Sequence, residues 1–79
     1  MAANQGSVTM PDLGDVSDAL VVQWLCAEGE RVNEGDDLLE VETEKTTFVI
    51  PAPQDGVLRR IAAPEGTRVR QGDLLAELE

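Results

Sequence analysis

The sequence repeats once at a spacing of 37 residues, and no gap is needed to align the two copies. The copies share turn, strand and acidic positions: Asp18 with Asp55, Glu28-Gly29 with Glu65-Gly66, Arg31-Val32 with Arg68-Val69, Gly35-Asp36 with Gly72-Asp73, Leu38 with Leu75, Glu40 with Glu77, and Glu42 with Glu79. Two copies are too few for a solenoid, which needs a longer stack of repeats. The repeat therefore predicts two similar halves packed face to face about a pseudo-twofold axis.

Each copy has the pattern of short strands. Apolar residues alternate with polar ones, and Gly, Pro or Asp interrupts every stretch before a helical period is established. We expect strands at 7–10, 19–26, 31–32, 37–42 and 46–50, repeated in the second copy, with Pro51 and Pro53 ending the pairing. Alternation in segment 19–26 puts Leu20, Val22 and Trp24 on one face and Val21, Gln23 and Leu25 on the other. The predicted fold is all-β without helix: a flattened barrel or sandwich of two short-stranded antiparallel sheets with pseudo-twofold symmetry.

The chain length of 79 residues fits one domain, which we expect over 7–79 behind a flexible tail at 1–6. The only aromatic residues are Trp24 and Phe48, so Val, Leu, Ile and Ala must fill most of the interior. We expect both aromatic residues in the core. Cys26 aligns with Ala63 in the repeat, so we expect it to be a small buried residue.

Charge and composition exclude several functions. Six basic residues stand against sixteen acidic ones, and the net charge of −10 disfavours nucleic acid and anionic membranes as partners. It favours partner proteins with basic docking faces. With one cysteine and no histidine, the chain can form no internal disulfide and offers no soft metal ligands. No apolar run is long enough for a membrane span and the first residues do not form a signal peptide, so we expect a cytoplasmic protein.

Lys45 lies at the centre of the turn that joins the two strands on either side of it. An ordinary solvent-exposed charge is one interpretation of such a residue. A covalent carrier needs the same placement, because an attaching enzyme must reach the amine and the attached arm must move freely. In the repeat, the Lys45 hairpin occupies in one half the place that the chain termini occupy in the other. We therefore expect the lysine and the termini at opposite ends.

From about Ser7 to Glu79 the chain resembles the lipoyl domain of 2-oxo acid dehydrogenase complexes, a branch of the biotinyl and lipoyl attachment family. Residues 40–46, Glu-Val-Glu-Thr-Glu-Lys-Thr, are similar to the family's attachment motif, usually E-T-D-K-A. Residues 10–14 are similar to the family's opening segment, and Trp24 stands where the family often has Trp. Gly29 and Gly56 lie at the spacings from Lys45 at which the family places turn glycines. Three positions depart from the pattern, which usually has Asp at Glu44, Ala or Val at Thr46, and Gly at Ala19.

The resemblance implies that Lys45 carries lipoate in amide linkage and shuttles acyl groups and reducing equivalents between active sites. The domain would be a monomeric, non-catalytic carrier of the kind found in dihydrolipoamide acyltransferase components. Its partners would be a lipoate ligase or lipoyl/octanoyl transferase, a thiamine-dependent decarboxylase, an acyltransferase core and dihydrolipoamide dehydrogenase. Residues expected to serve ligase or partner recognition are Glu42, Glu44, Thr46, Gly29, Gly56 and Asp15. The loop from Asp12 to Asp18 is expected to lie beside the Lys45 hairpin as a docking surface.

Three other functions are compatible with this kind of sequence. A biotinyl carrier shares the fold but typically has Met on both sides of its lysine, where this chain has Glu44 and Thr46. A glycine-cleavage H protein is normally longer and has additional helical segments. An unmodified β-sandwich adaptor, in which Lys45 is inert, comes from a different functional class. The domain is expected either as a free-standing carrier or as part of a longer acyltransferase.

Overall fold

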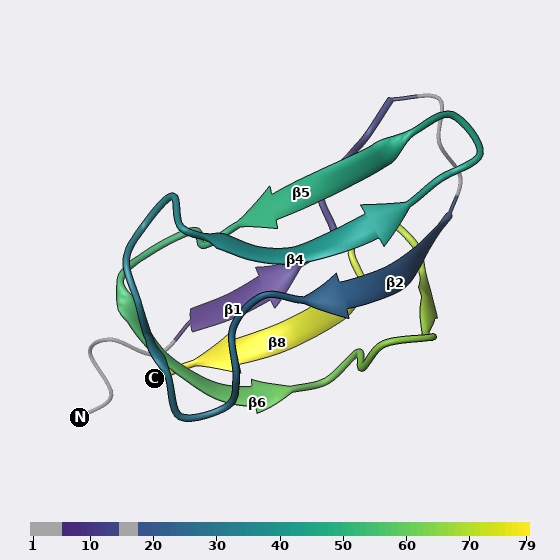
Figure 1. The fold of residues 1–79 in the computed structure, drawn as a ribbon. Coiled ribbons are helices and arrows are strands. Elements are labelled where there is room, and N and C mark those ends of the chain that lie inside the picture. Colours follow the sequence, from purple (N-terminus) through teal and green to yellow (C-terminus); the bar gives the residue numbers. More distant parts are fainter. Residues whose placement is uncertain (1–5, 15–17) are drawn as a thin grey trace.

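A computed structural model of the chain describes residues 6–14 and 18–79 (Figure 1). The regular elements in these residues are all strands: β1 (Gly6–Thr9), β2 (Ala19–Trp24), β3 (Arg31–Val32), β4 (Asp37–Glu42), β5 (Thr47–Pro51), β6 (Gly56–Ile61), β7 (Arg68–Val69) and β8 (Leu74–Leu78). They form two four-stranded antiparallel sheets, so the all-β prediction is confirmed. Across these residues, no helix is long and apolar enough to cross a membrane.

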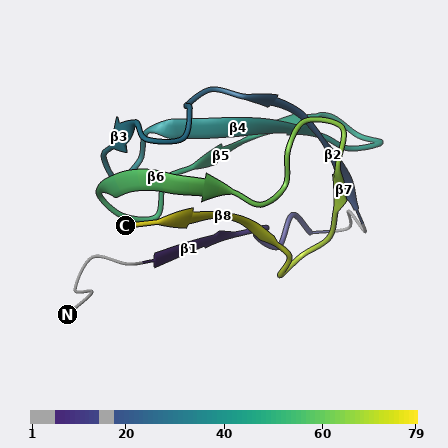
Figure 2. The same cartoon turned by 90° about the horizontal axis from the view of Figure 1, so that it is seen from below.

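The two sheets have the same architecture and lie as two layers (Figure 2). One has the strand order β1-β8-β6-β3, and the other has the order β5-β4-β2-β7. A shift of 37 residues places β2, β3 and β4 on β6, β7 and β8. The short strands exchange sheets, because β3 of the first half pairs with β6 and β7 of the second half pairs with β2. The predicted pseudo-twofold structure is therefore present, and each half completes the other's sheet.

Aliphatic side chains fill the space between the layers. The largest fully buried side chains are Leu38, Leu39, Leu58, Leu75, Leu78, Val8, Val21, Val32 and Val41. Trp24 and Phe48, which we expected in the core, are only half-buried and pack against its border. At the border the Trp24 indole can satisfy its N–H, which donates to the Ala63 carbonyl oxygen at 2.7 Å. Cys26 is also half-buried rather than buried, and its thiol donates to the Asp37 carbonyl oxygen at 3.6 Å.

A β-bulge changes the facing of residues in β2. The register with β4 shifts between Val21 and Gln23, so Val22 and Gln23 together lie opposite Glu40 and both are exposed. After the bulge, Trp24 returns to the core side, which it shares with Val21. The strict alternation that we expected is therefore wrong beyond Val21, because one extra residue resets the period. The second copy has the same irregularity in β6, between Leu58 and Arg60.

The strand ends differ slightly from the expected bounds. Gly6, which we assigned to the tail, is the first residue of β1 and pairs with Leu78. Pro51 pairs with Asp37, so pairing in β5 continues one residue further than expected. The rest of the predicted tail, residues 1–5, lies outside the described residues.

Candidate functional site

The Lys45 turn is ordered by one hydroxyl group. β4 and β5 pair as far as Glu42 with Thr47, which leaves residues 43–46 as the turn. The Thr43 hydroxyl oxygen accepts hydrogen bonds from the backbone N–H of Lys45 at 3.1 Å and of Thr46 at 3.0 Å. The same hydroxyl donates to the Thr46 carbonyl oxygen at 2.8 Å, and the Thr43 N–H donates to that oxygen at 2.9 Å. This network fixes the backbone on both sides of Lys45.

The Lys45 side chain itself is exposed. It is the only lysine in the chain, so it provides the only side-chain amine. The ion pairs among the described residues join Arg59 to Glu79, Arg60 to Glu77 and Arg68 to Asp18, and none of them includes Lys45. The turn therefore combines a fixed backbone with an amine that an enzyme can reach.

The hairpin and the chain-terminal strands lie at opposite ends of the molecule. The β4–β5 turn is at one end in Figure 1, while the start of β1 and the end of β8 are together at the other. The chain measures 39 Å along its longest axis and 19 Å across. The opposite placement that the repeat predicted is confirmed, since β8 and β1 take the positions of β4 and β5 in the other sheet.

The predicted recognition residues fall into two groups. Glu42, Glu44 and Thr46 are exposed at the tip with Lys45. Gly29 and Gly56 lie at the chain-terminal end: the Gly29 N–H donates to the Leu58 carbonyl oxygen, and a Cβ on Gly56 would come within 3.0 Å of the Glu79 carbonyl oxygen. Asp15 lies outside the described residues. Any recognition role of these residues remains a prediction.

Part of the predicted docking loop does lie beside the hairpin. Asp18 and Arg68 form an ion pair at 3.5 Å, and both line a hollow of about 240 Å³ together with Leu20, Glu42, Thr43 and Glu44. Sequence reasoning missed the role of Thr43 in ordering the turn and the position of Arg68 beside it. A threonine at the start of a turn is a recognisable signal, because its hydroxyl can bond to backbone groups further along. The position of Arg68 depends on β7 crossing to the other sheet and has no local signal.

The chain is similar to proteins of a known family. Residues 6–78 match the family described as "Biotin-requiring enzyme". The chain is 33% identical over 76 residues to the dihydrolipoyllysine-residue succinyltransferase component of the 2-oxoglutarate dehydrogenase complex from Buchnera aphidicola, covering 95% of this chain and 19% of that relative. It is 41% identical over 71 residues to the dihydrolipoyllysine-residue acetyltransferase component of the acetoin cleaving system from Pseudomonas putida, covering 89% of this chain and 19% of the relative. The chain thus spans a small part of the length of these relatives.

Solved structures show the same fold. The lipoyl domain of the 2-oxoglutarate dehydrogenase complex from Azotobacter vinelandii aligns with a TM-score of 0.70 and 28% identity, covering 92% of this chain and 96% of that chain. The urea carboxylase of Kluyveromyces lactis aligns with a TM-score of 0.80 and 24% identity, covering 96% of this chain and 6% of that chain, which shows the fold alone. The chain therefore belongs to the biotin and lipoyl attachment family, as a non-catalytic carrier domain of the lipoyl type.

Proposed function

We propose that Lys45 is the attachment residue of this carrier domain and holds lipoate in amide linkage. The observation that carries this proposal is the exposed tip itself, where four hydrogen bonds around Thr43 order the backbone and leave the sole lysine amine unpaired among the described residues. These residues fit the group, because an amide-linked arm needs an accessible amine on a fixed backbone and no enclosing pocket. When bound, lipoate supplies a disulfide that accepts acyl groups and electrons.

The chain's own residues position the arm. Thr43 holds the turn, and the pairing of β4 with β5 sets which side chains face outward at the tip. Nothing at the turn is arranged to activate the amine, since the chain has no histidine and Lys45 has no ion-pair partner in the described residues. The attaching enzyme must therefore supply activation, and the domain acts as its substrate.

The tip residues Glu42, Glu44 and Thr46 are the side chains that we expect an attaching enzyme to recognise, because they are exposed at the same turn as Lys45. The distant Gly29 and Gly56 would contribute through the fold. In this proposal the domain serves a 2-oxo acid dehydrogenase-type complex in the cytoplasm. It would meet a lipoate ligase or lipoyl/octanoyl transferase first, and then a thiamine-dependent decarboxylase, an acyltransferase core and dihydrolipoamide dehydrogenase.

Mass spectrometry tests the attachment. Incubated with a lipoate ligase, lipoate and ATP, the domain should gain the mass of one lipoyl amide, and peptide sequencing should locate it at Lys45. Lys45→Arg keeps the positive charge but removes the primary amine, so this variant should fold normally and remain unmodified. Attachment at the N-terminal amine, or no attachment to a folded domain, would refute the proposal.

A further inference from the structure

The pseudo-twofold symmetry provides two outer sheet faces that can be compared position by position. On the first, which we call the tip face, Val49, Glu40 and Gln23 lie side by side on β5, β4 and β2. On the second, the terminal face, the equivalent positions on β1, β8 and β6 hold Ser7, Glu77 and Arg60. The bulges add Val22 to the tip face and Arg59 to the terminal face. The two faces share their backbone and differ in their side chains.

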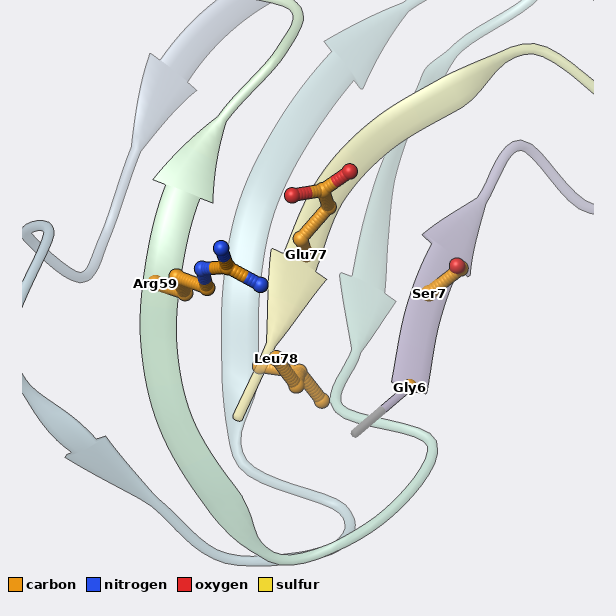
Figure 3. A pocket seen from close by; sticks show the side chains of 5 residues that line it. All are labelled: Gly6, Ser7, Arg59, Glu77 and Leu78. Carbon is orange, nitrogen blue, oxygen red and sulfur yellow. The ribbon is translucent and has the colours of Figure 1, made fainter. Parts of the chain in front are cut away.

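The terminal face neutralises its own carboxylates. Arg60 Nε lies 3.6 Å from Glu77 Oε1, and Arg59 Nε lies 3.9 Å from Glu79 Oε1. Figure 3 shows Arg59 reaching from β6 toward β8, where Glu77 projects, with Ser7 on β1 beyond it. Gly6, Ser7, Arg59, Glu77 and Leu78 line a hollow of about 220 Å³ there. Because each acid has a cation from its own chain, this face offers a partner little net charge.

The tip face holds the same two carboxylates without those cations. Glu40 and Glu42 are the repeat equivalents of Glu77 and Glu79, while Val22 and Gln23 replace Arg59 and Arg60. No ion pair of the described residues includes Glu40 or Glu42. A row of paired residues runs across the strands from Glu42 through Leu20 to Arg68. Arg68 is therefore two strand spacings, roughly 10 Å, from Glu42. It is also already paired with Asp18.

Apolar side chains flank the unpaired carboxylate. Val49 is 44% exposed and Val22 is 37% exposed, which makes them two of the three large hydrophobic side chains that are exposed among the described residues. They stand on either side of Glu40, on neighbouring strands. A basic side chain that docks against Glu40 gains a charge-assisted hydrogen bond, while apolar groups beside it remove the valines from water. This chemistry fits a protein surface that presents a cation between apolar residues.

We propose that the tip face is the surface on which enzymes acting on Lys45 dock, through a guanidinium or ammonium group placed against Glu40 and apolar contacts to Val22 and Val49. This inference rests on the proposed carrier function. β4 runs from Glu40 directly into the Lys45 turn, so a protein seated on this face has the arm at its edge. A second copy of the chain is a poor occupant, since at a net charge of −10 each copy repels the other.

Chemical-shift mapping on the isotope-labelled domain tests the proposal. The probe is a five-residue peptide in which two arginines alternate with three leucines and both ends are blocked. Backbone shifts should change at Val22, Glu40 and Val49 and stay unchanged at Ser7, Arg59 and Glu77. Equal changes on both faces, changes confined to the terminal face, or no change at saturating peptide would each overturn the proposal. Concentration-dependent broadening of the tip face without peptide would overturn it in favour of self-association.

Exchanging equivalent side chains between the two faces gives matched variants, because each new side chain already occupies the equivalent position of the other sheet. Val22→Arg with Gln23→Arg copies the terminal-face cations onto the tip face and should weaken peptide binding by about tenfold, or 1.4 kcal/mol. The control, Arg59→Val with Arg60→Gln, frees the terminal acids and should create a second set of shifts around Glu77. Unchanged peptide affinity in the first variant would contradict the proposal. Because the map is recorded without lipoate, it separates failure of this surface from failure of attachment at Lys45.

Discussion

Glu65 lies 41 residues after Trp24, yet its Oε2 accepts a hydrogen bond from the Trp24 backbone N–H at 3.1 Å. The repeat contains the reciprocal contact, because Glu28 Oε2 accepts from the Ile61 backbone N–H at 2.8 Å. Glu28 is the repeat equivalent of Glu65, and Trp24 is the equivalent of Ile61. Each half therefore supplies a carboxylate to the strand of the other half, just after the bulge in that strand. The two contacts join the halves in addition to the exchanged short strands.

We expect Glu65→Ala and Glu28→Ala each to lower the free energy of unfolding by about 1 kcal/mol, because each leaves a backbone donor without its charged acceptor. For a domain of this size the melting temperature should fall by about 4–8 °C. The double variant should lose about the sum, since the two contacts share no residue. Glu34→Ala is the control, because its side chain is exposed and accepts no such bond among the described residues. Calorimetry with no difference between Glu65→Ala and the control would contradict this account.

Thr43→Val should loosen the Lys45 turn while keeping the side-chain shape. The substitution removes the hydroxyl that bonds to Lys45 and Thr46, and we expect a loss of about 1–2 kcal/mol in unfolding free energy. Amide hydrogen exchange should accelerate at Lys45 and Thr46 before it does in the core strands. Thr43→Ser should restore slow exchange, and Thr47→Val on the neighbouring strand should leave it unaltered. Equal exchange rates in all variants would show that the hydroxyl does not order the tip.

Strand positions and symmetry could be predicted from the sequence, because they depend on local patterns. The repeat at Glu28-Gly29 and Glu65-Gly66 marks equivalent turns, and alternation marks the strands between them. The bulge at Val22 could not be predicted in this way. The composition of a strand does not reveal a bulge. The bulge appears only when the register with Glu40 is known. As a result, the predicted facing of Trp24 is wrong, and the sequence pattern does not show which residues lie beside Glu40.

The site was predicted to the extent that it is local in the chain. Lys45 and its neighbours follow each other in one turn, so the sequence alone places them together. Arg68 reaches the tip only through the pairing of β7 with β2 across the two halves. For Gly29 and Gly56 the family resemblance implied a recognition role from their spacing to Lys45, whereas the structure places them at the chain-terminal end. Spacing along a chain constrains turns well and distances between turns poorly.

Gly29→Ala should destabilise the fold without changing recognition. Gly29 has a φ of 90°, where an added Cβ meets no atom within 4 Å but the backbone is strained by roughly 1–2 kcal/mol for other residues. Gly66, its repeat equivalent, has a φ of 92° and equally open surroundings, so Gly66→Ala is a matched control. Both variants should melt at lower temperature and accept lipoate at equal rates well below their melting points. A slower ligase reaction for Gly29→Ala alone would assign that glycine a direct recognition role.

Alkylation of Cys26 should be slow at neutral pH. Burial raises the pKa of the thiol above its ordinary value of 9.0, and the negative charges of Glu30, Asp36 and Asp37 raise it further. The thiolate is the form that reacts with iodoacetamide. The alkylation rate should therefore rise only above pH 9.0 in the folded domain, and at a lower pH in the domain unfolded by urea. Glu30→Gln keeps an acceptor for the Ala27 N–H and should shift the profile to lower pH. Because the folded thiol holds its proton more tightly than the unfolded one, its stability contribution is present below pH 9.0 and lost above it. Coincident folded and unfolded profiles would contradict this assignment.

Discrimination between lipoate and biotin should depend on Glu44 and Thr46. Attaching enzymes of both kinds meet a similar folded hairpin, so selectivity must come from side chains near the amine. An enzyme site shaped for methionine on both sides of the lysine would desolvate the Glu44 carboxylate without pairing it, which costs several kcal/mol. At about 1.4 kcal/mol per decade, that penalty slows biotin transfer by about a hundredfold or more.

The double change Glu44→Met with Thr46→Met should raise the biotin transfer rate, whereas the same change at the exposed pair Glu34 and Thr47 should have no effect. Parallel ligase assays in which the unaltered domain accepts biotin as fast as lipoate would remove the physical basis for choosing lipoate as its cofactor.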